Sequence, residues 1–468
     1  MVIIADGARP DTLASAMEEG RLPALAAMRE EGGFHTVTSC FPSVTGPAYT
    51  PFIMGRFPGD VGLPGLRWFD RSRRVARLPG HSRSYVGPEM RFIDSDLDPS
   101  SPTIFELCEP SIGALSVIRR GLPVANRVGT GATFAARTGL THFRGNVPGW
   151  LRIDRAIASQ VRRRIRDEGP RFTFAALTGI DKTSHAEGHE SALVAEAFAI
   201  VDETAGQIRR DAERDGRWAR MHLWVCSDHG HSRVLQHEDL VTLVEASGSR
   251  RKVLAHPWAF NARADIAVMV SGNAMAHLYV DLDRRERPGW NALVTEWHDL
   301  VVQLEARDSV DLILLPKSAD ECEVRGGRRG SATITRKNGR YQYLHRTGNP
   351  LGIGEGIDVT AAEAHERTLE CDYPDAIVQI AQLSGCTRSG DIILSAARDW
   401  DFRARYEPIP HVSSHGALHR DHMLVPLLLN RAPGKIPRRT IDLMPSALSA
   451  LGITIPSMVE GESFTPHY

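Results

Sequence analysis

The chain has 468 residues, of which 42% are hydrophobic and 24% are charged, and this composition is that of a soluble globular protein. The length predicts one large domain with an insertion, or two domains. Because 56 basic residues stand against 57 acidic ones, the net charge of −1 gives no electrostatic reason to expect a nucleic-acid polymer as the main partner.

Six cysteines occur without any C-x-x-C pair, which argues against a thiolate zinc site and against a disulfide framework. No apolar run is long enough for a membrane span. Met1 leads straight into an apolar stretch, so the sequence predicts a cytoplasmic protein, or a secreted or periplasmic one if a leader precedes it. The oligomeric state is left open.

Apolar periodicity and turn residues predict the elements of the N-terminal part. These are a buried strand at 2–5 that ends at Asp6-Gly7, two short helices within 11–29, a strand at 36–38, a short helix at 46–55 and a loop at 55–68. Further along, the same signals predict strands at 172–177, 221–226 and 423–429, an amphipathic helix at 191–214 and a closing helix at 443–451.

Strands that alternate with helices predict an α/β fold with a mostly parallel central sheet and helices on both of its faces. We expect this catalytic core to comprise residues 1–249 and 396–468. Residues 250–395 depart from this alternation of strands and helices. They contain predicted strands at 276–280 and 310–315, a helix at 290–304 and a polar hairpin around Asn338-Gly339. They therefore predict an inserted α+β cap subdomain.

Three predicted strands each end in an acidic residue: Asp6, Asp181 and Asp228. Functional groups of an open parallel sheet collect at the carboxyl ends of its strands. A single aspartate after a strand is usually a turn residue, but two of these three are accompanied by His185 and His229. His415 adds another imidazole on a glycine-flanked loop.

Carboxylate and imidazole ligands without thiolates suit Zn²⁺ or a similar transition metal. These six groups exceed what one four-coordinate site with an open position requires, and they suffice for two divalent ions of the kind used in phosphoryl chemistry. Other histidines are interpreted as surface or supporting groups rather than ligands: His189, His231, His237 and His277.

Three candidate nucleophiles lie within six residues: Cys40, Ser43 and Thr45. Thr45 precedes Gly46 and Pro47, a pattern typical of the start of a helix, with a hydroxyl near the N-cap and Pro at or near the first helical position. A hydroxyl there would face free backbone N–H groups, which suits an anionic substrate. The alternative interpretation is a simple capped turn.

Five motifs together carry a family resemblance. They are Asp6-Gly7 after the first strand, Thr45 followed by Pro47, Asp181-x-x-x-His185-x-x-Gly188, Ser227-Asp228-His229-Gly230 and Ser414-His415-Gly416. Their order is that of the alkaline phosphatase superfamily, and the chain most resembles its type I phosphodiesterase/nucleotide pyrophosphatase branch. The resemblance covers the chain outside the insert.

The resemblance implies two metal sites and a hydrolase of phosphodiesters or nucleotide pyrophosphates. One ion would be held by Asp6, Thr45, Asp228 and His229, and the other by Asp181, His185 and His415. It further implies that Thr45 attacks phosphorus in line, and that water cleaves the resulting phosphothreonine intermediate. The partner would be a small-molecule phosphoester.

The chain departs from the family at positions that contact the substrate. Relatives read Thr-x-Pro-Asn-His, whereas here the last two residues are Ala48 and Tyr49. Relatives also place an asparagine that donates to the phosphate twenty-one residues after the nucleophile, where this chain has Leu66. Arg67 is a candidate replacement. Tyr49, Leu66 and Arg67 are therefore the expected substrate contacts, and substrate preference is the open question.

Other functions remain as alternatives. A phosphomonoesterase or phosphonate hydrolase on the same scaffold would aim extra cations at the phosphate, and Arg9, Arg67 and Lys182 lie near the motifs. A sulfatase is less favoured, because the segment that begins at Cys40 lacks the arginine its maturation needs, with Val44 in that place. A non-catalytic binding protein is disfavoured by the intact ligand set.

Overall fold

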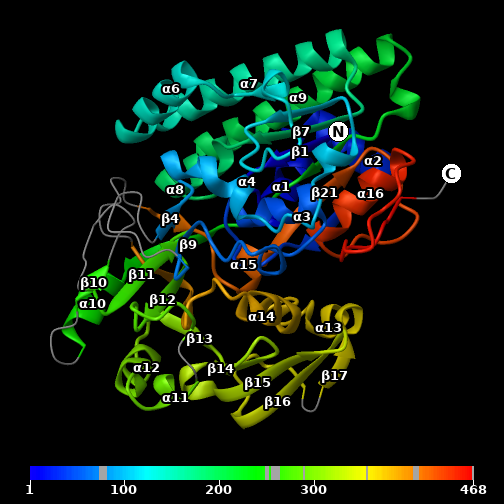
Figure 1. Cartoon of the computed structure of the whole chain (residues 1–468). Helices are drawn as coiled ribbons and strands as arrows, with labels where there is room; N and C mark the ends of the chain where they lie inside the picture. The colour runs from blue at the N-terminus through cyan, green and yellow to red at the C-terminus, as the bar shows by residue number, and fades with distance from the viewer. Residues whose placement is uncertain are drawn as a thin grey trace.

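The computed structural model describes residues 1–72, 82–247, 252–254, 264–287, 290–354, 357–403 and 411–465. Within them the chain builds two large sheets, one in the helix-rich upper part of Figure 1 and one in its lower part. The candidate site lies where the two parts meet.

The first sheet has seven strands, and all but one run in the same direction. In spatial order they are β2 (Phe34–Thr38), β21 (Leu424–Leu429), β8 (Trp224–Cys226), β1 (Val2–Ala5), β7 (Phe172–Leu177), β5 (Ser111–Ala114) and β6 (Arg127–Val128). Strand β21 is antiparallel to both of its neighbours, while β8, β1, β7, β5 and β6 pair in parallel. The predicted, mostly parallel sheet is confirmed.

Helices cover both faces of this sheet, which explains why its central strands are apolar at every position. Val2 and Ile4 of β1 face one apolar cluster, and Ile3 and Ala5 face the other. The first cluster is closed by α3 (Thr50–Met54), α4 (Ile93–Asp96), α5 (Ile104–Leu107) and α16 (Leu443–Ala450). The second is closed by α1 (Pro10–Glu18), α2 (Pro23–Gly32), α7 (Val147–Glu168), α8 (Gly179–Glu187) and α9 (Ala192–Arg214).

The second sheet has nine strands and is almost entirely antiparallel. In spatial order they are β10 (Val253–Leu254), β11 (Ile266–Ser271), β12 (Met275–Val280), β18 (Ile392–Ala396), β13 (Val310–Pro316), β14 (Glu321–Arg325), β15 (Gly330–Lys337), β16 (Arg340–Gly348) and β17 (Ile357–Thr360). The helices on its faces are α10 (Leu240–Ala246), α11 (Trp290–Val294) and α12 (His298–Glu305) on one side, and α13 (Ala361–Thr368) and α14 (Ala376–Gly385) on the other.

This sheet-rich region is the predicted α+β cap. The helix expected at 290–304 is two helices, α11 and α12, and the polar hairpin is formed by β15 and β16. Helix α10 precedes residue 250 yet packs with the second sheet. The division of the chain at 249/250 and 395/396 stays a proposal.

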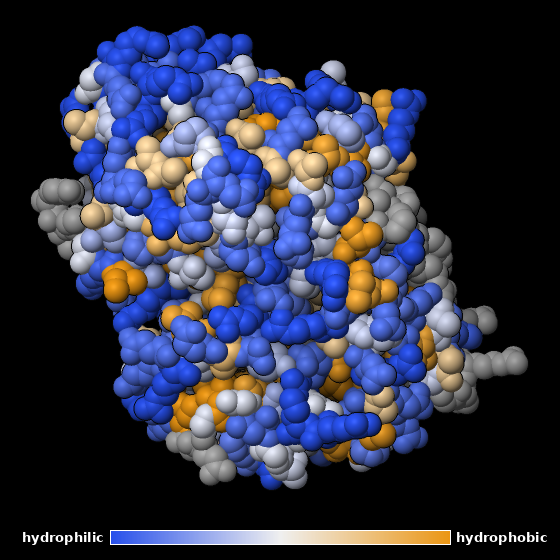
Figure 2. All heavy atoms as spheres, turned by 180° about the vertical axis from the view of Figure 1, so that it is seen from behind, coloured by the Kyte–Doolittle hydropathy of each residue, from blue (hydrophilic) through white to orange (hydrophobic). Residues whose placement is uncertain are grey.

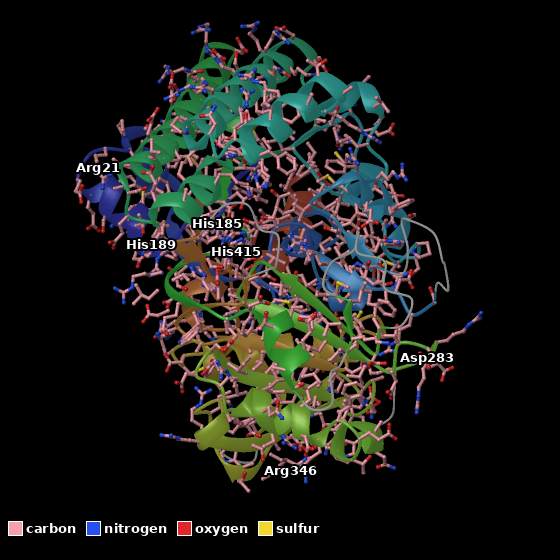
Figure 3. The ribbon with its side chains drawn as sticks, turned by 90° about the vertical axis from the view of Figure 1, so that its left-hand side faces the viewer. Arg21, His185, His189, Asp283, Arg346 and His415 are labelled. Atoms are coloured by element: carbon pink, nitrogen blue, oxygen red, sulfur yellow. The ribbon has the colours of Figure 1, made fainter. Side chains whose placement is uncertain are left out.

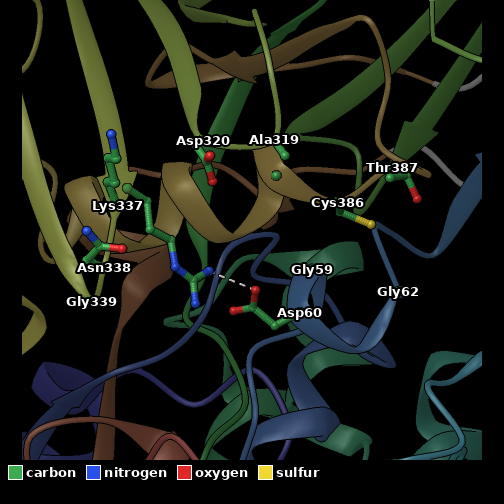
Figure 4. A pocket seen from close by; sticks show the side chains of 12 residues that line it. Gly59, Asp60, Gly62, Ala319, Asp320, Lys337, Asn338, Gly339, Cys386 and Thr387 are labelled. Carbon is green, nitrogen blue, oxygen red and sulfur yellow. Dashed lines mark hydrogen bonds and ion pairs between the residues drawn. The ribbon is translucent and has the colours of Figure 1, made fainter.

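Two small sheets and several contacts join the parts. The strands β19 (Asp399–Asp401), β9 (Ser232–His237) and β20 (Ser413–Ser414) form one small sheet, and β3 (Arg67–Phe69) pairs with β4 (Ser82–Ser84) in the other. Arg336 at the end of the β15–β16 hairpin donates to Asp60 of the core at 2.8 Å (Figure 4). The cap therefore rests on the core through polar as well as apolar contacts.

The remaining segments include helix α6 (Ala132–Phe143), which runs beside α7, and the short α15 (Arg420–Met423). Figure 2 shows that the face opposite to that of Figure 1 is mainly hydrophilic, with apolar side chains in small separate groups. Among the described helices, none combines the length and apolar character needed to cross a membrane. All six cysteines are described, and all are free thiols.

Candidate metal centre and active site

Three acidic residues stand at the carboxyl ends of adjacent strands of the first sheet. Asp6 follows β1, Asp228 comes two residues after β8, and Asp181 lies in the first turn of α8, directly after β7. Since β8, β1 and β7 are parallel neighbours, their carboxyl ends open on one edge of the sheet. The N–H of Asp6 donates to the carbonyl of Leu177 at 3.1 Å and extends the β1–β7 ladder to this edge.

A first cluster surrounds the hydroxyl of Thr45. Its Oγ1 lies 3.3 Å from Oδ1 of Asp6 and 3.2 Å from Nε2 of His229. The same His229 nitrogen lies 3.4 Å from Asp6 Oδ1 and 3.6 Å from Asp228 Oδ2. The two carboxylates and the imidazole are buried, and Thr45 is half-buried.

A second cluster surrounds Oδ1 of Asp181. The Nε2 atoms of three histidines approach this oxygen: His231 at 2.9 Å, His185 at 3.2 Å and His415 at 3.4 Å. The ligand atoms of these four buried residues lie within 4.8 Å of one another. Those of Asp6, Asp181 and His229 also lie within 4.8 Å of one another, so the two groups share Asp181. The rings of His229 and His415 stack with centroids 3.7 Å apart, so the two clusters adjoin.

Backbone carbonyls orient three of the imidazoles by accepting a hydrogen bond from Nδ1, the ring nitrogen that points away from the cluster. Nδ1 donates to Gly230 O at 3.1 Å in His229, to Ser413 O at 2.9 Å in His185, and to Ser43 O at 2.9 Å in His415. Because a carbonyl can only accept, the proton of each neutral ring sits on Nδ1 and the bare Nε2 lone pair faces the cluster. This arrangement is that of metal-ligating histidines.

The small three-stranded sheet holds two of these histidines in place. Strand β20 ends at Ser414, directly before His415, and β9 begins at Ser232, directly after His231. The pairing of Ser414 with Ser232 therefore sets both rings at the same edge of the site.

The site gathers several buried carboxylates, a charge pattern that suits a cation. Both carboxylate oxygens of Asp228 are buried without a hydrogen-bond partner among the described residues. Burial, followed by the charges of Asp228 and Asp181, raises the pKa of Asp6 well above its usual range, and burial likewise raises the pKa of Asp228. Burial alone would also raise the pKa of Asp181, but the charge of Lys182 and the contacts of His185 and His231 hold it well below its usual range.

The donor set fits divalent metal ions. Carboxylate oxygens lie 3.2–3.4 Å from the Nε2 atoms of His185, His229 and His415. Because these rings carry their proton on Nδ1, no hydrogen bond joins an ionised carboxylate to Nε2. Buried anions of this kind are stable only when paired or bound to a metal. The residues present thus suit a site for divalent cations.

The three candidate nucleophiles are distinguished by their surroundings. The Cys40 thiol is fully buried, and burial raises its pKa above its usual range. Ser43 is also fully buried, and its hydroxyl donates to Ala417 O at 2.9 Å. Only the Thr45 hydroxyl faces the carboxylate and imidazole groups.

Thr45 lies directly before the N-cap residue of a short helical turn, and Pro47 takes its first position, as the pattern predicts. Gly46, with φ of 102°, is the residue that precedes the short 3₁₀ turn Pro47–Tyr49, and no side chain caps this turn. The hydroxyl of Thr45 instead points to Asp6 and His229. The Thr45 hydroxyl therefore contacts the carboxylate and imidazole groups and does not cap this turn.

A cavity of about 140 Å³ opens beside these clusters. Leu66 and Arg67, two of the predicted substrate contacts, line it, and so does Lys182, whose Nζ lies 2.7 Å from Asp181 Oδ2. Tyr49 does not line it, because its ring is buried against Phe174 with centroids 5.3 Å apart. The remaining lining residues are Thr45, Val86, His142, Gly145, Val147, Trp150, Asp181, His185, Ala186, Gly272, Asn273, His411 and His415.

Figure 3 places His185 and His415 close together at the junction of the helix-covered core and the second sheet, far from Asp283 and Arg346. His189 lies to the left of His185 and His415 in this view and is not among the grouped ligand residues. Arg9, which donates to Asp11 at 2.9 Å and 2.6 Å, lines a different cavity. Neither is part of the cluster.

Sequence reasoning missed three polar residues of the site. His231 contacts Asp181, His411 stacks on His185 with centroids 4.1 Å apart, and Asn273 reaches the cavity from the second sheet. The spacing His229-x-His231 was visible in the sequence, and so was His411 four residues before His415. Asn273 gave no local signal beyond a Gly-Asn turn.

Asp154 of α7 supports the start of α8, which carries Asp181 and His185. Its carboxylate accepts the backbone N–H groups of Thr178 at 3.0 Å and Gly179 at 2.6 Å. Burial raises the pKa of Asp154 to about 7, although the two N–H donors act in the opposite direction. The folded protein thus holds a proton that the unfolded chain, with a pKa of about 3.9, releases earlier.

We therefore expect the contribution of Asp154 to folding stability to decline as the pH rises from about 4 to about 7. Asp154→Asn removes this titration and serves as the reference. Between about pH 4 and about pH 7, the free energy of unfolding of the wild type, minus that of the variant, should fall by about 2–4 kcal/mol. Denaturant unfolding of both proteins at a series of pH values measures the difference. A difference that stays constant or rises with pH contradicts the shift.

A protein-family comparison identifies the group to which this geometry belongs. Residues 1–419 match the family model described as type I phosphodiesterase/nucleotide pyrophosphatase. The chain belongs to this family. Family membership supports a phosphoester hydrolase that depends on metal, and the resemblance inferred from the motifs is confirmed. A comparison with curated protein sequences gives no match.

Solved structures share the fold at low sequence identity. Phosphonoacetate hydrolase from Sinorhizobium meliloti, in complex with phosphonoformate, is 15% identical with a TM-score of 0.58, over 96% of this chain and 95% of that chain. Murine ectonucleotide pyrophosphatase/phosphodiesterase 5 is 14% identical with a TM-score of 0.55, and its human counterpart is 13% identical with a TM-score of 0.57. Both cover 97% of this chain and 95% of their own. These likenesses show that the family member described here has the alkaline-phosphatase-like fold.

Proposed function

We propose that this protein is a metal-dependent hydrolase of phosphodiesters or nucleotide pyrophosphates in which Thr45 is the nucleophile. The proposal rests on the surroundings of the Thr45 hydroxyl, which lies beside Asp6 Oδ1 and His229 Nε2. The neighbouring Asp228 carboxylate is buried without a hydrogen-bond partner among the described residues. An uncharged binding pocket would not need such a set, since burying unpaired carboxylates is costly.

Two divalent ions fit the donor set. Asp6, Thr45, Asp228 and His229 would hold one, and Asp181, His185 and His415 would hold the other. Oxygen and imidazole donors without thiolates favour Zn²⁺. When bound, the metal would supply Lewis acidity that lowers the pKa of the hydroxyl and offsets charge on the phosphoryl oxygens.

The chain's own residues then carry the reaction in two displacements. Oγ1 of Thr45 loses its proton and forms a bond to phosphorus while the bond from phosphorus to the leaving oxygen breaks. The leaving oxygen takes up a proton, which gives an alcohol and a phosphothreonine that keeps the second ester group. A water oxygen next bonds to phosphorus and the Thr45–phosphorus bond breaks, which restores the hydroxyl. Asp6 and His229, at 3.3 Å and 3.2 Å from Oγ1, orient the hydroxyl for the first displacement.

A phosphonate hydrolase or phosphomonoesterase is the second candidate. Arg67 and Lys182 both line the small cavity, and added cations suit the second negative charge of a monoester or phosphonate. A structure with the same fold is a phosphonoacetate hydrolase. A sulfatase has less support, because Cys40 is buried and Val44 stands in place of the arginine its maturation needs.

The substrate class is tested by side-by-side assays of the metal-loaded protein. Aryl phosphodiester, phosphomonoester, phosphonate and sulfate esters with the same leaving group are compared by kcat/KM. We expect the diester to be preferred. A monoester or phosphonate that turns over faster by orders of magnitude overturns the diester assignment, and absence of hydrolysis with stoichiometric metal bound overturns the proposed function.

A further inference from the structure

The cavity lacks a neutral donor at the position where the sequence departs from its family. Leu66 and Thr45 line the same cavity, and a leucine side chain cannot donate to a phosphoryl oxygen. Arg67 lies next to it, but its Nη1 donates to the carbonyl of Val270 at 3.3 Å. If Thr45 attacks phosphorus as proposed above, the oxygens of the phosphoryl group need a partner on this side of the site.

A turn of the second sheet reaches this place. The turn between β11 and β12 follows Ser271, whose Oγ accepts the backbone N–H of Leu66 at 2.8 Å. Ala274 N–H donates to the carbonyl of His415 at 3.0 Å, and Ser414 Oγ donates to Gly272 O at 3.2 Å. The turn is therefore bonded both to position 66 and to the loop that carries His415.

The turn also lies directly against the segment that carries the nucleophile. A Cβ added to Gly272 would lie 1.9 Å from Cγ1 of Val44, the residue before Thr45. Gly272 has a φ of 64°, which favours glycine as well. A side chain at this position would push the turn away from Thr45, so this close approach requires glycine.

Asn273 is the polar residue that this turn delivers. It has a φ of 64°, its side chain is almost entirely buried, and it lines the cavity together with Thr45. Asparagine adopts this left-handed conformation more readily than most non-glycine residues, so it can follow Gly272 in this turn. The cap therefore contributes a carboxamide to a site built otherwise from the core.

The carboxamide is held by His411. Asn273 Nδ2 lies 2.7 Å from Nδ1 of His411, and the His411 ring stacks on His185 with centroids 4.1 Å apart. No second hydrogen bond to the Asn273 side chain occurs among the described residues. Since an amide nitrogen carries two N–H bonds, one bond to His411 leaves the other to donate within the cavity.

We propose that Asn273 donates to a phosphoryl oxygen of the substrate and takes the place of the asparagine that is absent at Leu66. His411 acts as a positioning residue, because it fixes the rotamer of the carboxamide without itself meeting the phosphorus. The proposal rests on the proposed function and deepens it: a neutral donor adds no charge, which suits the single negative charge of a diester.

Asn273→Ala tests the contact, with Asn338→Ala as the matched control. Asn338 also has a positive φ, 52°, in the β15–β16 turn, so its replacement by alanine imposes a comparable backbone strain. Asn338 lines a different pocket from the one lined by Thr45 and Asn273 (Figure 4). Each protein is loaded with zinc and assayed on an aryl phosphodiester and on its analogue with sulfur in place of one non-bridging oxygen. Metal content and thermal unfolding are measured in parallel.

We expect Asn273→Ala to lower kcat/KM for the oxygen ester by about 10²-fold, the effect of losing one such donor, with metal content unchanged. The penalty for sulfur substitution should shrink in this variant, because the donor that distinguishes oxygen from sulfur is gone. Asn338→Ala should behave as the wild type.

Two results would overturn the inference: unchanged kcat/KM in Asn273→Ala, or an equal loss on both esters, which a purely structural role would give. If the wild-type protein hydrolyses neither ester, the proposed function fails and this inference fails with it.

Discussion

Thr45→Ala is expected to lower the rate of ester hydrolysis by about 10³-fold or more, while the protein stays folded and keeps its metal. The loss follows because the only hydroxyl among the three candidates that faces the carboxylate and imidazole groups is removed. Asp6, Asp228 and His229 remain to hold a cation, so metal content should fall far less than activity. Steady-state kinetics and metal analysis of purified protein measure both effects.

The wild-type enzyme should also carry the predicted intermediate. Acid quench during turnover of a phosphodiester, followed by mass spectrometry, should find one phosphoryl group that still carries the second ester substituent on the peptide that contains Thr45. Ser43→Ala is the matched control, since Ser43 lies two residues away and its hydroxyl donates to Ala417 O at 2.9 Å. This control should cost about 1 kcal/mol of stability and leave kcat/KM near the wild-type value. Full activity of Thr45→Ala would refute the mechanism.

Much of the core was readable from local signals. The strand at Val2–Ala5, the two helices separated near Gly20 and Pro23, and the helix that begins after Ser191 all appear where expected. Each rests on information within a few residues: an apolar run that is buried on both faces, a turn residue, or a hydroxyl that caps the next helix. Ser191, for example, accepts the N–H of Val194 at 3.4 Å.

Other features depend on contacts that no short stretch of sequence encodes. Antiparallel pairing of β21 with β2 joins Phe34 to Leu428, and β18 enters the nine-stranded sheet between β12 and β13 although it comes later in the chain than every other strand of that sheet. Asn273 reaches the site only because Gly272 lets its turn approach Val44. Residue type alone could not separate His231, which contacts Asp181, from His277, which contacts Pro64 O at 2.9 Å.

The predicted capping role of the Thr45 hydroxyl failed for a related reason. Thr-Gly-Pro is a fair signal for the start of a helix, yet Gly46 adopts a φ of 102° and turns the chain before Pro47. Thr45 is left outside the turn with its hydroxyl toward Asp6. The hydroxyl therefore makes a long-range contact with Asp6 at the carboxyl end of β1 instead of capping the turn that follows it.

Asp228→Asn should change the stability of the protein in opposite directions with and without metal. In the metal-free protein the buried carboxylate has no hydrogen-bond partner among the described residues, and burial raises its pKa. An amide of the same shape removes the unpaired charge, so the metal-free variant should gain about 1–3 kcal/mol of stability. With metal present, the carboxylate is a ligand that the amide replaces poorly, so the holo variant should be less stable than the holo wild type.

Thermal unfolding after exhaustive chelation, and again after addition of Zn²⁺, separates the two effects. Chelation should abolish hydrolysis by the wild type and lower its unfolding midpoint, and Zn²⁺ should restore both. The metal-free variant should unfold at a higher temperature than the metal-free wild type, and it should gain much less from Zn²⁺. If Asp228→Asn destabilises the metal-free protein, then Asp228 has a structural partner in the fold and the case for a cation at this carboxylate fails. If the variant is instead more stable than the wild type without Zn²⁺ and less stable with it, then the bound ion is what compensates for burying the Asp228 carboxylate.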